Sequence, residues 1–371
     1  MITIWMHRRR ILFLTILFIL ALILSLTTPG LIAGNKETIH IRGSGSTFLQ
    51  LQLMAWMTLF HKVHPSITIE YNGVGSGAGQ QQFFEHLTDF CGSDPPLSHK
   101  TWLEYKGRIL QLPIVLGAVA VIYNIPGLGG HRLRLDGEVL SMIYLGKIKY
   151  WDNSYIKKSN PGISNLLPHA KIIVVHRSDS SGTTEIFTYY LYRSSNGLWP
   201  ERLVGKDIEW PVDRTGRGLG GKGNAGIVSI VKNTPYSIGY VELSYAIRYG
   251  LDIALLRNRA GYYVEPNTTT IITAGENAAR TGLLPGSPTG DFSRELEAIV
   301  YSPGKLSYPI TCFTHIIIWA KYPLHKAEAI GDFLSWIVSS GDKHIIPGYA
   351  PLPGPVKEII VRAVKLMKSG G

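Results

Sequence analysis

The sequence predicts an α/β fold, because strand-like and helix-like segments alternate along most of its 371 residues. Hydrophobic residues make up 45% of the chain and charged residues only 17%, which is typical of a well-packed globular protein and not of a disordered one. Three stretches rich in Gly, Ser and Thr also indicate this class, since each follows a strand-like run and leads into a helix-like one: 43–48, 73–79 and 177–184. The length is sufficient for two domains with a sizeable core.

Hydrophobic spacing predicts the elements of the first part of the chain. Strands are expected at 38–42, 67–72 and 109–123, and helices at 49–64, 80–88 and 98–106. The His64-Pro65 pair ends the first helix, because the residue before a proline disfavours helical geometry, and Ser98 is a suitable cap for the third. Residues 109–123 form the longest β-rich run of this part, although Gln111, Pro113 and Gly117 interrupt it. A strand that crosses from one domain to another would have this pattern.

The second part of the chain continues the alternation. Strands are expected at 171–176, 237–241, 308–311 and 315–320, and helices at 139–145, 184–193, 227–232, 244–249, 326–338 and 355–367. A glycine-rich loop is expected at 218–226, and residues 250–307 are expected to be rich in loops.

The N-terminus has the pattern of a targeting segment. The basic stretch 7–10 precedes an almost unbroken apolar run at 11–26, which residues 27–33 could extend to the length of a membrane span. No cysteine lies in this region, so a lipid-modified N-terminal cysteine is excluded. We therefore expect residues 1–34 to be a signal peptide or an N-terminal membrane anchor. The protein would be exported, to the periplasm or the cell surface.

Charge and cysteine content narrow the class of partners. The formal net charge is +11, yet no dense Lys/Arg run follows residue 10, which favours a solvated basic surface over a nucleic-acid interface. A field that attracts anions is compatible with this surface. The two cysteines, Cys91 and Cys312, form no metal-binding pattern, and the chain has no HExxH motif, so we expect no metal site. Their apolar surroundings are compatible with a disulfide and with two buried thiols.

The three Gly/Ser/Thr loops share a physical property. Glycine lets backbone N–H groups approach a ligand, and a helix start leaves such groups unpaired and carries partial positive charge. One such loop is common, but three in one chain, with Arg177 in the third, predict a small oxyanion held from several sides.

Other motifs are weaker. Residues 216–223 nearly match the phosphate-loop pattern GxxxxGK[ST], but Gly223 replaces the hydroxyl residue that would hold Mg²⁺. The stretch that begins at Gly73 approximates a dinucleotide fingerprint, with Ala78 in place of its third glycine. Serines 44, 46, 76 and 181 lie in no Gly-x-Ser-x-Gly elbow, which leaves a serine hydrolase as a minor alternative.

Two acidic residues, Asp179 and Asp94, could take part in the predicted anion site. Arg177 would leave the end of a strand beside a helix start, where its guanidinium could bind an oxyanion through two hydrogen bonds. Asp179 could fix Arg177 for that purpose, or could pair with it only to shape the loop. Asp94 precedes a proline, and from the residues alone it is best interpreted as an ordinary turn residue. It would assist binding only if the ligand still carried a proton.

The order of these motifs is similar to that of a known family. The chain resembles the phosphate-binding protein of the high-affinity phosphate ABC importer from about residue 38 to its C-terminus. The matching blocks are 43–48, 71–77, 89–98, 112–117, 123–128, 143–152, 176–183, 218–224, 238–242 and 308–311. Residues 250–307 match poorly. Ser46 replaces a usual alanine, Gly77 a common serine, and Cys91 a frequent glycine.

The resemblance implies a two-lobed periplasmic-binding-protein-like (type II) fold. Each lobe would be a mixed sheet flanked by helices, and two hinge strands would join the lobes. Lobe I would comprise 35–115 and 308–371, and lobe II 116–307. The chain would be a non-enzymatic and monomeric phosphate receptor outside the cytoplasmic membrane, without a cofactor. It would deliver inorganic phosphate to the membrane permease subunits of an ABC transporter.

The resemblance also implies a ligand shell. Its members would be Thr47, Phe48, Ser76, Asp94, Arg177, Ser181, Gly182 and Thr183, with Asp179 and Ser46 in support. Asp94 would then discriminate against sulfate, which has no proton to donate at neutral pH. Two alternatives remain: a binder of another tetrahedral oxyanion, and a secreted phosphatase-like protein on the same scaffold.

Overall fold

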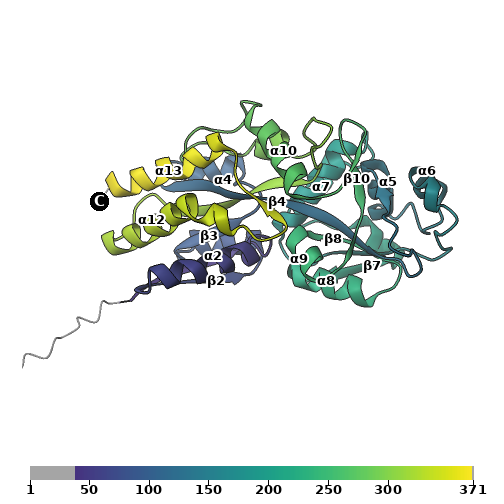
Figure 1. Cartoon of the computed structure of the whole chain (residues 1–371), viewed down its shortest axis with the longest axis horizontal. Coiled ribbons are helices and arrows are strands. Elements are labelled where there is room, and N and C mark those ends of the chain that lie inside the picture. Colours follow the sequence, from purple (N-terminus) through teal and green to yellow (C-terminus); the bar gives the residue numbers. More distant parts are fainter. Residues whose placement is uncertain (1–37, 370–371) are drawn as a thin grey trace, which may run out of the picture. The chain divides into compact units, whose positions relative to one another are not determined.

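One strand, β4 (Ile109–Asn124), joins the two halves of the main sheet. From Ile109 to Ala118 it pairs antiparallel with β12 (Thr311–Trp319), and from Val119 to Asn124 it pairs antiparallel with β8 (Ser237–Glu242). The computed structural model describes residues 38–369, and Figure 1 shows β4 passing through both halves. The long strand expected at 109–123 is therefore confirmed.

The main sheet has ten strands and is mixed. Its order is β2-β1-β3-β12-β4-β8-β6-β7, and two short strands, β13 and β9, also pair with β4. Parallel pairs lie toward both edges, where β1 pairs with β2 and β3, and β6 pairs with β7 and β8. The remaining bounds are β1 Ile39–Gly45, β2 Ile67–Gly73, β3 Phe90–Ser93, β6 Ile173–Arg177, β7 Gly218–Gly221, β9 Asp252–Ile253 and β13 Tyr349–Ala350. A separate small sheet contains β5 Arg134–Leu135, β10 Leu255–Arg257 and β11 Tyr263–Val264.

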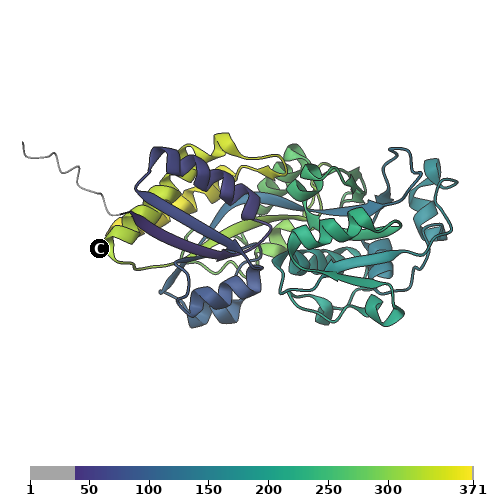
Figure 2. The ribbon, with the colours of Figure 1, turned by 90° about the horizontal axis from the view of Figure 1, so that it is seen from below.

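We call the part around β2, β1, β3, β12 and the first half of β4 the first lobe, and the part around the second half of β4, β8, β6 and β7 the second lobe. Helices cover both faces of the strands in the first lobe (Figure 2). They are α2 Gln50–Val63, α3 Ser76–Phe84, α4 His99–Glu104, α12 Leu324–Ser339 and α13 Gly354–Ser369. The second lobe has α5 Gly137–Tyr144, α6 Ser154–Ser159, α7 Gly182–Ser194, α8 Gly223–Asn233 and α9 Leu243–Arg248. Two more helices, α10 Thr268–Ala279 and α11 Glu295–Ile299, lie against β12.

Each lobe has aromatic pairs in its core, which join two helices in the first lobe and a helix to the sheet in the second. In the first lobe, Phe60 of α2 packs edge-on against Phe333 of α12, with ring centroids 5.1 Å apart. In the second lobe, Phe187 of α7 stacks on Tyr240 of β8 at 4.3 Å. Buried aromatic pairs of this kind remove a large apolar area from water, and this packing holds the start of α7 at the end of the sheet.

A second connection runs beside β4 at the point where its partners change. The Tyr308 hydroxyl donates to the carbonyl of Val119 at 2.9 Å, and the N–H of Val119 donates to the carbonyl of Ile310 at 2.9 Å. The α/β fold of mixed sheets flanked by helices is thus confirmed. The residue boundaries expected for the two lobes, 35–115 with 308–371 and 116–307, stay a prediction.

Several expected elements differ from the structure. Helix α3 begins at Ser76 and not at 80, because Gly75 adopts a left-handed φ of 92° that turns the chain out of β2 at once. Residues 218–226, expected to be a loop, contain β7 and the start of α8. The two strands expected at 308–311 and 315–320 are the single strand β12, which begins at Thr311.

The prediction of a loop-rich segment at 250–307 is wrong over α10. This helix begins with a capping box, in which Asn267 and Thr270 each accept a hydrogen bond from the other's backbone N–H. Both cysteines are free and buried, which settles the open choice in favour of thiols. Between residues 38 and 369, no helix is long and apolar enough to cross a membrane. The signal peptide or anchor expected at 1–34 lies outside the described residues.

Candidate functional site

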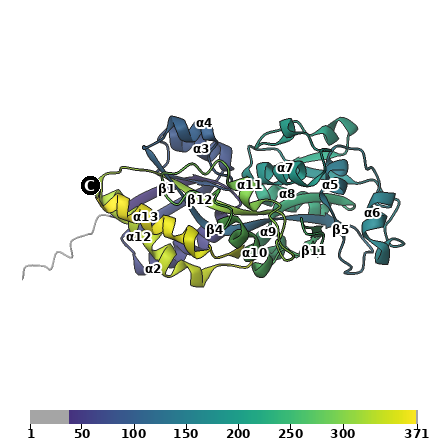
Figure 3. The same cartoon turned by 90° about the horizontal axis from the view of Figure 1, so that it is seen from above.

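The three Gly/Ser/Thr loops meet at the ends of parallel strands. One follows β1 and leads into α2, one follows β2 and leads into α3, and one follows β6 and leads into α7. In α/β sheets, ligands bind at these carboxyl ends. Helices α3 and α7 approach each other from the two lobes (Figure 3), and the N–H of Gly77 donates to the carbonyl of Ser180 at 3.3 Å. The loops therefore form one region shared by both lobes.

Asp94 lies in the first-lobe wall of this region and is 1% exposed. The Ser46 hydroxyl donates to its Oδ1, and the Ser76 hydroxyl donates to its Oδ2 at 3.3 Å. Burial raises the pKa of Asp94 to about 7, although the Ser46 hydrogen bond and the charge of Arg177 act in the opposite direction. The carboxyl group can therefore gain or lose its proton close to neutral pH.

Arg177, at the end of β6, supplies a buried cation on the second-lobe side. Its Nε donates to Asp179 Oδ1 at 2.7 Å, and its Nη2 donates to the other carboxylate oxygen. The remaining nitrogen, Nη1, lies 3.4 Å from the hydroxyl of Thr183. Burial alone would raise the pKa of Asp179, but the hydrogen bonds and charge of Arg177 lower it overall. Asp179 thus fixes the guanidinium and leaves one edge for other partners.

The start of α7 forms the other part of the second-lobe wall. Ser181 caps the helix, and its hydroxyl accepts from the N–H of Thr184 at 3.2 Å. A Cβ at Gly182 would lie 2.5 Å from the Ser76 Oγ and 2.9 Å from Asp94 Oδ2, so only glycine fits here. The first N–H groups of α7 have no partner within the helix and carry its positive dipole end.

Thr47 and Phe48 complete the first-lobe wall. The Thr47 hydroxyl accepts from Asn224 Nδ2 of α8 at 3.0 Å, and Asn224 Oδ1 in turn accepts from the N–H of Glu242. Phe48 is fully buried, and its carbonyl accepts from the Tyr349 hydroxyl, which fixes the loop before α2. Asn224 was not among the expected site residues, although it closes the block 218–224 that carries part of the resemblance.

Direct contacts between the lobes enclose the region. Besides Thr47–Asn224, the Lys206 ammonium donates to Gln80 Oε1 at 3.0 Å. The expected site residues are buried, with Thr47 the most exposed of them at 8%, except Asp179, which is partly buried. A ligand at this site would be surrounded by protein, and the lobes would have to separate to admit it. The structure brings all ten expected residues into this one region. Lys206 also contacts the first lobe from the second lobe, but it belongs to none of the sequence motifs described above.

The chemistry of the region suits a proton-bearing oxyanion. Its donors are one edge of the Arg177 guanidinium, helix N–H groups and several hydroxyls, and its acceptor is the carboxyl group of Asp94; Asp179 is already paired with Arg177, and the Lys206 ammonium donates to Gln80. In the described part of the chain, no histidine is hydrogen-bonded to Ser46, Ser76 or Ser181, and the hydroxyls of Ser46 and Ser76 donate to the carboxyl group of Asp94. Among the same residues, no group of three or more His, Cys, Asp or Glu could hold a metal ion.

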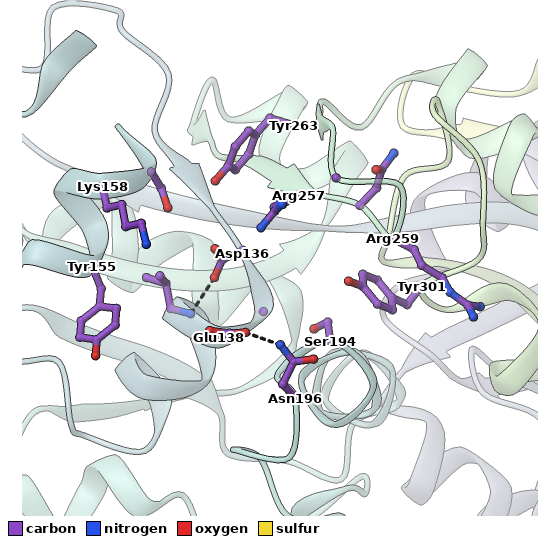
Figure 4. Close-up of a pocket in the computed structure, with 15 residues that line it drawn as sticks. Asp136, Glu138, Tyr155, Lys158, Ser194, Asn196, Arg257, Arg259, Tyr263 and Tyr301 are labelled. Atoms are coloured by element: carbon purple, nitrogen blue, oxygen red, sulfur yellow. Dashed lines mark hydrogen bonds between the residues drawn. The ribbon is translucent and has the colours of Figure 1, made fainter. Parts of the chain in front are cut away.

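A different cavity, of about 420 Å³, lies elsewhere in the second lobe (Figure 4). Its wall combines cations such as Lys158 and Arg257 with the carboxylates Asp136 and Glu138. Both carboxylates already accept hydrogen bonds, from the N–H of Val139 and from the side chain of Asn196. None of the expected site residues lines this cavity.

Comparison with known proteins gives matches to one superfamily and to phosphate-binding proteins. The PBP superfamily domain matches residues 33–340. The phosphate-binding protein PstS of Methanocaldococcus jannaschii is 45% identical over 345 residues, which cover 90% of this chain and 88% of the relative. The phosphate-binding protein PstS of Pasteurella multocida is 35% identical over 325 residues, with coverage of 85% and 87%.

A solved structure shares the fold. It is a high-affinity periplasmic phosphate-binding protein, PfluDING, bound with phosphate. The likeness has a TM-score of 0.68 at 23% identity and covers 88% of this chain and 93% of that one.

Proposed function

The chain belongs to the PstS family of phosphate-binding proteins, within the PBP superfamily, and on that premise we propose that it is an extracytoplasmic receptor for inorganic phosphate. It would deliver its ligand to the permease subunits of an ABC importer, and it would not be an enzyme. The observation that carries the proposal is the position of Asp94, a buried carboxylate in a wall of hydrogen-bond donors.

Most of the binding would come from groups without a full charge. Because Asp179 already holds two nitrogens of Arg177, the guanidinium presents mainly Nη1 to a ligand. The N–H groups at the start of α7, with the hydroxyls of Ser181 and Thr183, would then contact further phosphate oxygens from the second lobe. From the first lobe, the N–H of Phe48 and the hydroxyls of Thr47 and Ser76 would do the same.

Asp94 would make the site selective. An ionised carboxylate only accepts hydrogen bonds, so it attracts a P–OH group and repels a bare oxyanion. Phosphate carries at least one proton near neutral pH, whereas sulfate carries none. Sulfate would leave the buried carboxylate without its partner, and an unpaired buried charge is costly.

Lobe closure would complete the site. The three inter-lobe contacts, Thr47–Asn224, Gly77–Ser180 and Lys206–Gln80, lie beside the expected ligand shell. β4 and the segment at 308–310 run side by side between the lobes, so small dihedral changes there could open the region. A permease would then be able to distinguish the closed receptor from the open one. The exported location and the monomeric state are parts of this proposal.

Titration of the purified protein with phosphate, arsenate and sulfate, followed by calorimetry, tests the function. We expect tight binding of phosphate, binding of arsenate, which also carries a proton, and little binding of sulfate. Equal affinities for phosphate and sulfate would favour the alternative, a receptor for another tetrahedral oxyanion. Hydrolysis of a phosphomonoester that is lost in Ser46→Ala or Ser181→Ala would instead favour the phosphatase-like alternative.

A further inference from the structure

The cavity of about 420 Å³ in the second lobe has no part in the proposed phosphate site. Its wall is built from the start of α5, from α6, from the end of α7 and from the turn between β10 and β11. Figure 4 shows Lys158 at one side of the cavity, Arg259 at the other side, and Asp136 and Glu138 between them. Both signs of charge therefore line one space that is large enough for a small organic molecule.

One buried side chain fixes the turn between β10 and β11. Asn258 is 1% exposed, and its Nδ2 group donates to three carbonyls of the segment 304–307. Its Oδ1 accepts from two N–H groups of the turn itself. This turn carries Arg257 and Arg259, which both line the cavity. A backbone that is fixed before binding lowers the entropic cost of contacts made by such side chains.

Two residues of the wall have an unusual backbone conformation. Tyr301 has a φ of 58° and Asn196 a φ of 50°, in the left-handed region that residues with a Cβ rarely adopt. Between residues 38 and 369, four residues other than glycine have a positive φ, and two of them line this cavity. The N–H of Tyr301 donates to the carbonyl of Pro309 at 2.8 Å, and the Asn196 side chain donates to Glu138. Strain that the surroundings maintain in this way is frequent at binding sites.

The cations of the wall lack ionic partners. Within the described residues, Lys158, Arg257 and Arg259 form no ion pair. Asp136 and Glu138 each use one oxygen for a hydrogen bond within the protein, which leaves the other oxygen of each carboxylate available. The wall therefore offers a ligand three cations and two acceptor oxygens.

Both kinds of charge act on one point of the wall, the Tyr301 hydroxyl. Burial raises the pKa of Tyr301, Arg257 and Arg259 lower it, and Asp136 and Glu138 raise it. A ligand beside this hydroxyl would therefore meet the cations and the carboxylates together.

This combination of charges disfavours simple ions. The carboxylates would repel a bare anion, and the arginines and the lysine would repel a metal cation. A ligand that satisfies the whole wall has an anionic group for the cations and hydroxyl groups that donate to the carboxylates. Three unpaired cations suit a phosphate ester, which carries close to two negative charges at neutral pH, better than they suit a single carboxylate. Sugar hydroxyls are typical donors to a carboxylate in nucleotide sites.

We propose that this cavity is a second binding site of the protein, specific for a sugar phosphate that is either free or part of a nucleotide. Arg257 would bind the phosphate group through its guanidinium, and Lys158 and Arg259 would add positive potential from the two sides. Asp136 and Glu138 would accept hydrogen bonds from the sugar hydroxyls. The proposal goes beyond the phosphate site between the lobes and does not depend on it.

Calorimetric titration in excess inorganic phosphate tests the proposal, because the excess would fill the site between the lobes. The ligands are ribose 5-phosphate, adenosine 5′-monophosphate, ribose and glucuronate. We expect both phosphorylated ligands to bind at least about tenfold more tightly than ribose or glucuronate, the equivalent of one charge-assisted hydrogen bond. Equal affinities of the two phosphorylated ligands would identify the sugar phosphate as the recognised part. Tighter binding of the nucleotide would show that its base contributes as well.

Variants of the wall locate the binding. Arg257→Ala should weaken the binding of ribose 5-phosphate at least about tenfold, and Lys158→Ala should weaken it less. Asp136→Asn keeps a capping side chain for α5 but removes a negative charge, so the preference for ribose 5-phosphate over inorganic phosphate should fall. Arg248→Ala changes an exposed arginine of α9 outside the wall and should bind as the wild type does. Thermal denaturation shows whether each variant is folded.

Three results would overturn the proposal. They are ribose 5-phosphate binding no tighter than that of ribose or glucuronate, unchanged affinity in both Arg257→Ala and Lys158→Ala, and displacement of ribose 5-phosphate by an equal concentration of inorganic phosphate. Failure of the wild type to bind inorganic phosphate would contradict the proposed function instead. The titration with ribose 5-phosphate would then still decide whether the second site exists.

Discussion

Both lobes offer the site hydroxyl and backbone N–H groups, but the cation Arg177 comes from the second lobe and the carboxyl group of Asp94 from the first. Arg177 and the start of α7 would attract any small oxyanion, because neither distinguishes phosphate from sulfate. Asp94, Ser46 and Ser76 form a wall that repels an anion unless that anion has a proton to donate. The comparison indicates that the second lobe contributes most of the affinity and the first lobe most of the selectivity.

Arg177→Ala should have the largest effect. It removes the only cation of the ligand shell and leaves Asp179 as an unpaired carboxylate near the ligand. We expect phosphate affinity to fall at least about 100-fold, equivalent to about 3 kcal/mol. Arg193→Ala, near the other end of α7, is the control and should bind phosphate as the wild type does. Calorimetry measures both, and an affinity for Arg177→Ala within about tenfold of the wild type would contradict the division between the lobes.

Asp94→Asn should act on selectivity. The amide still accepts a hydrogen bond through its oxygen, but its NH₂ group can also donate to a fully ionised oxyanion. We expect phosphate to bind about tenfold more weakly and sulfate to bind more tightly than in the wild type, because about one charge-assisted hydrogen bond is lost. Competition between the two anions measures the ratio directly. An unchanged ratio would show that selectivity comes from elsewhere in the site.

Gly182→Ala tests whether the two walls must touch. The added Cβ would lie 2.5 Å from Pro95 Cδ and from the Ser76 Oγ, so the lobes could not close fully. We expect affinity to fall roughly tenfold, because strain from overpacking costs about 1–3 kcal/mol. Gly162→Ala is a control in the same lobe, since nothing lies within 4 Å of a Cβ there. X-ray scattering with and without phosphate would show the missing compaction, and normal compaction in Gly182→Ala would refute the argument.

The smallest expected effect concerns stability without ligand. The folded state keeps the proton of Asp94 up to pH about 7, whereas the unfolded chain releases it near pH 4, so Asp94 makes the fold less stable as pH rises through this window. Asn at this position cannot titrate. Between pH 4.5 and 7.5 the wild type should therefore lose about 2–4 °C more in Tm than Asp94→Asn. Thermal denaturation at both pH values measures this, and parallel curves would argue against a raised pKa.

Local patterns predicted much of the fold. The cap at Ser98 and the long strand β4 depend on neighbouring residues, and both are present. The start of α3, β7 and α10 were missed because their sequences are rich in Gly or Thr and lack a clear apolar period. Such segments take their structure from the sheet against which they lie.

The site was predictable only in part. The three loops indicated an anion from their residues alone, but the role of Asp94 came from the family resemblance, because a lone Asp before a proline is usually a turn residue. Asn224 could not be found by spacing, since it meets its partner Thr47 only through the contact between the lobes. Sequence motifs mark the groups that would touch a ligand more readily than the groups that support them.

The division of β4 between the lobes also has a consequence for the order in which a nascent chain can fold. The first-lobe part of the sheet lacks its central strand β12 until residue 319 has been made, whereas all main-sheet strands of the second lobe precede residue 254. Because synthesis proceeds from the N-terminus, the second lobe can therefore complete its sheet before β12, α12 and α13 of the first lobe have been made. The wall with the carboxylate would thus be the last part of the site to form, after the wall with the positive charge is already in place.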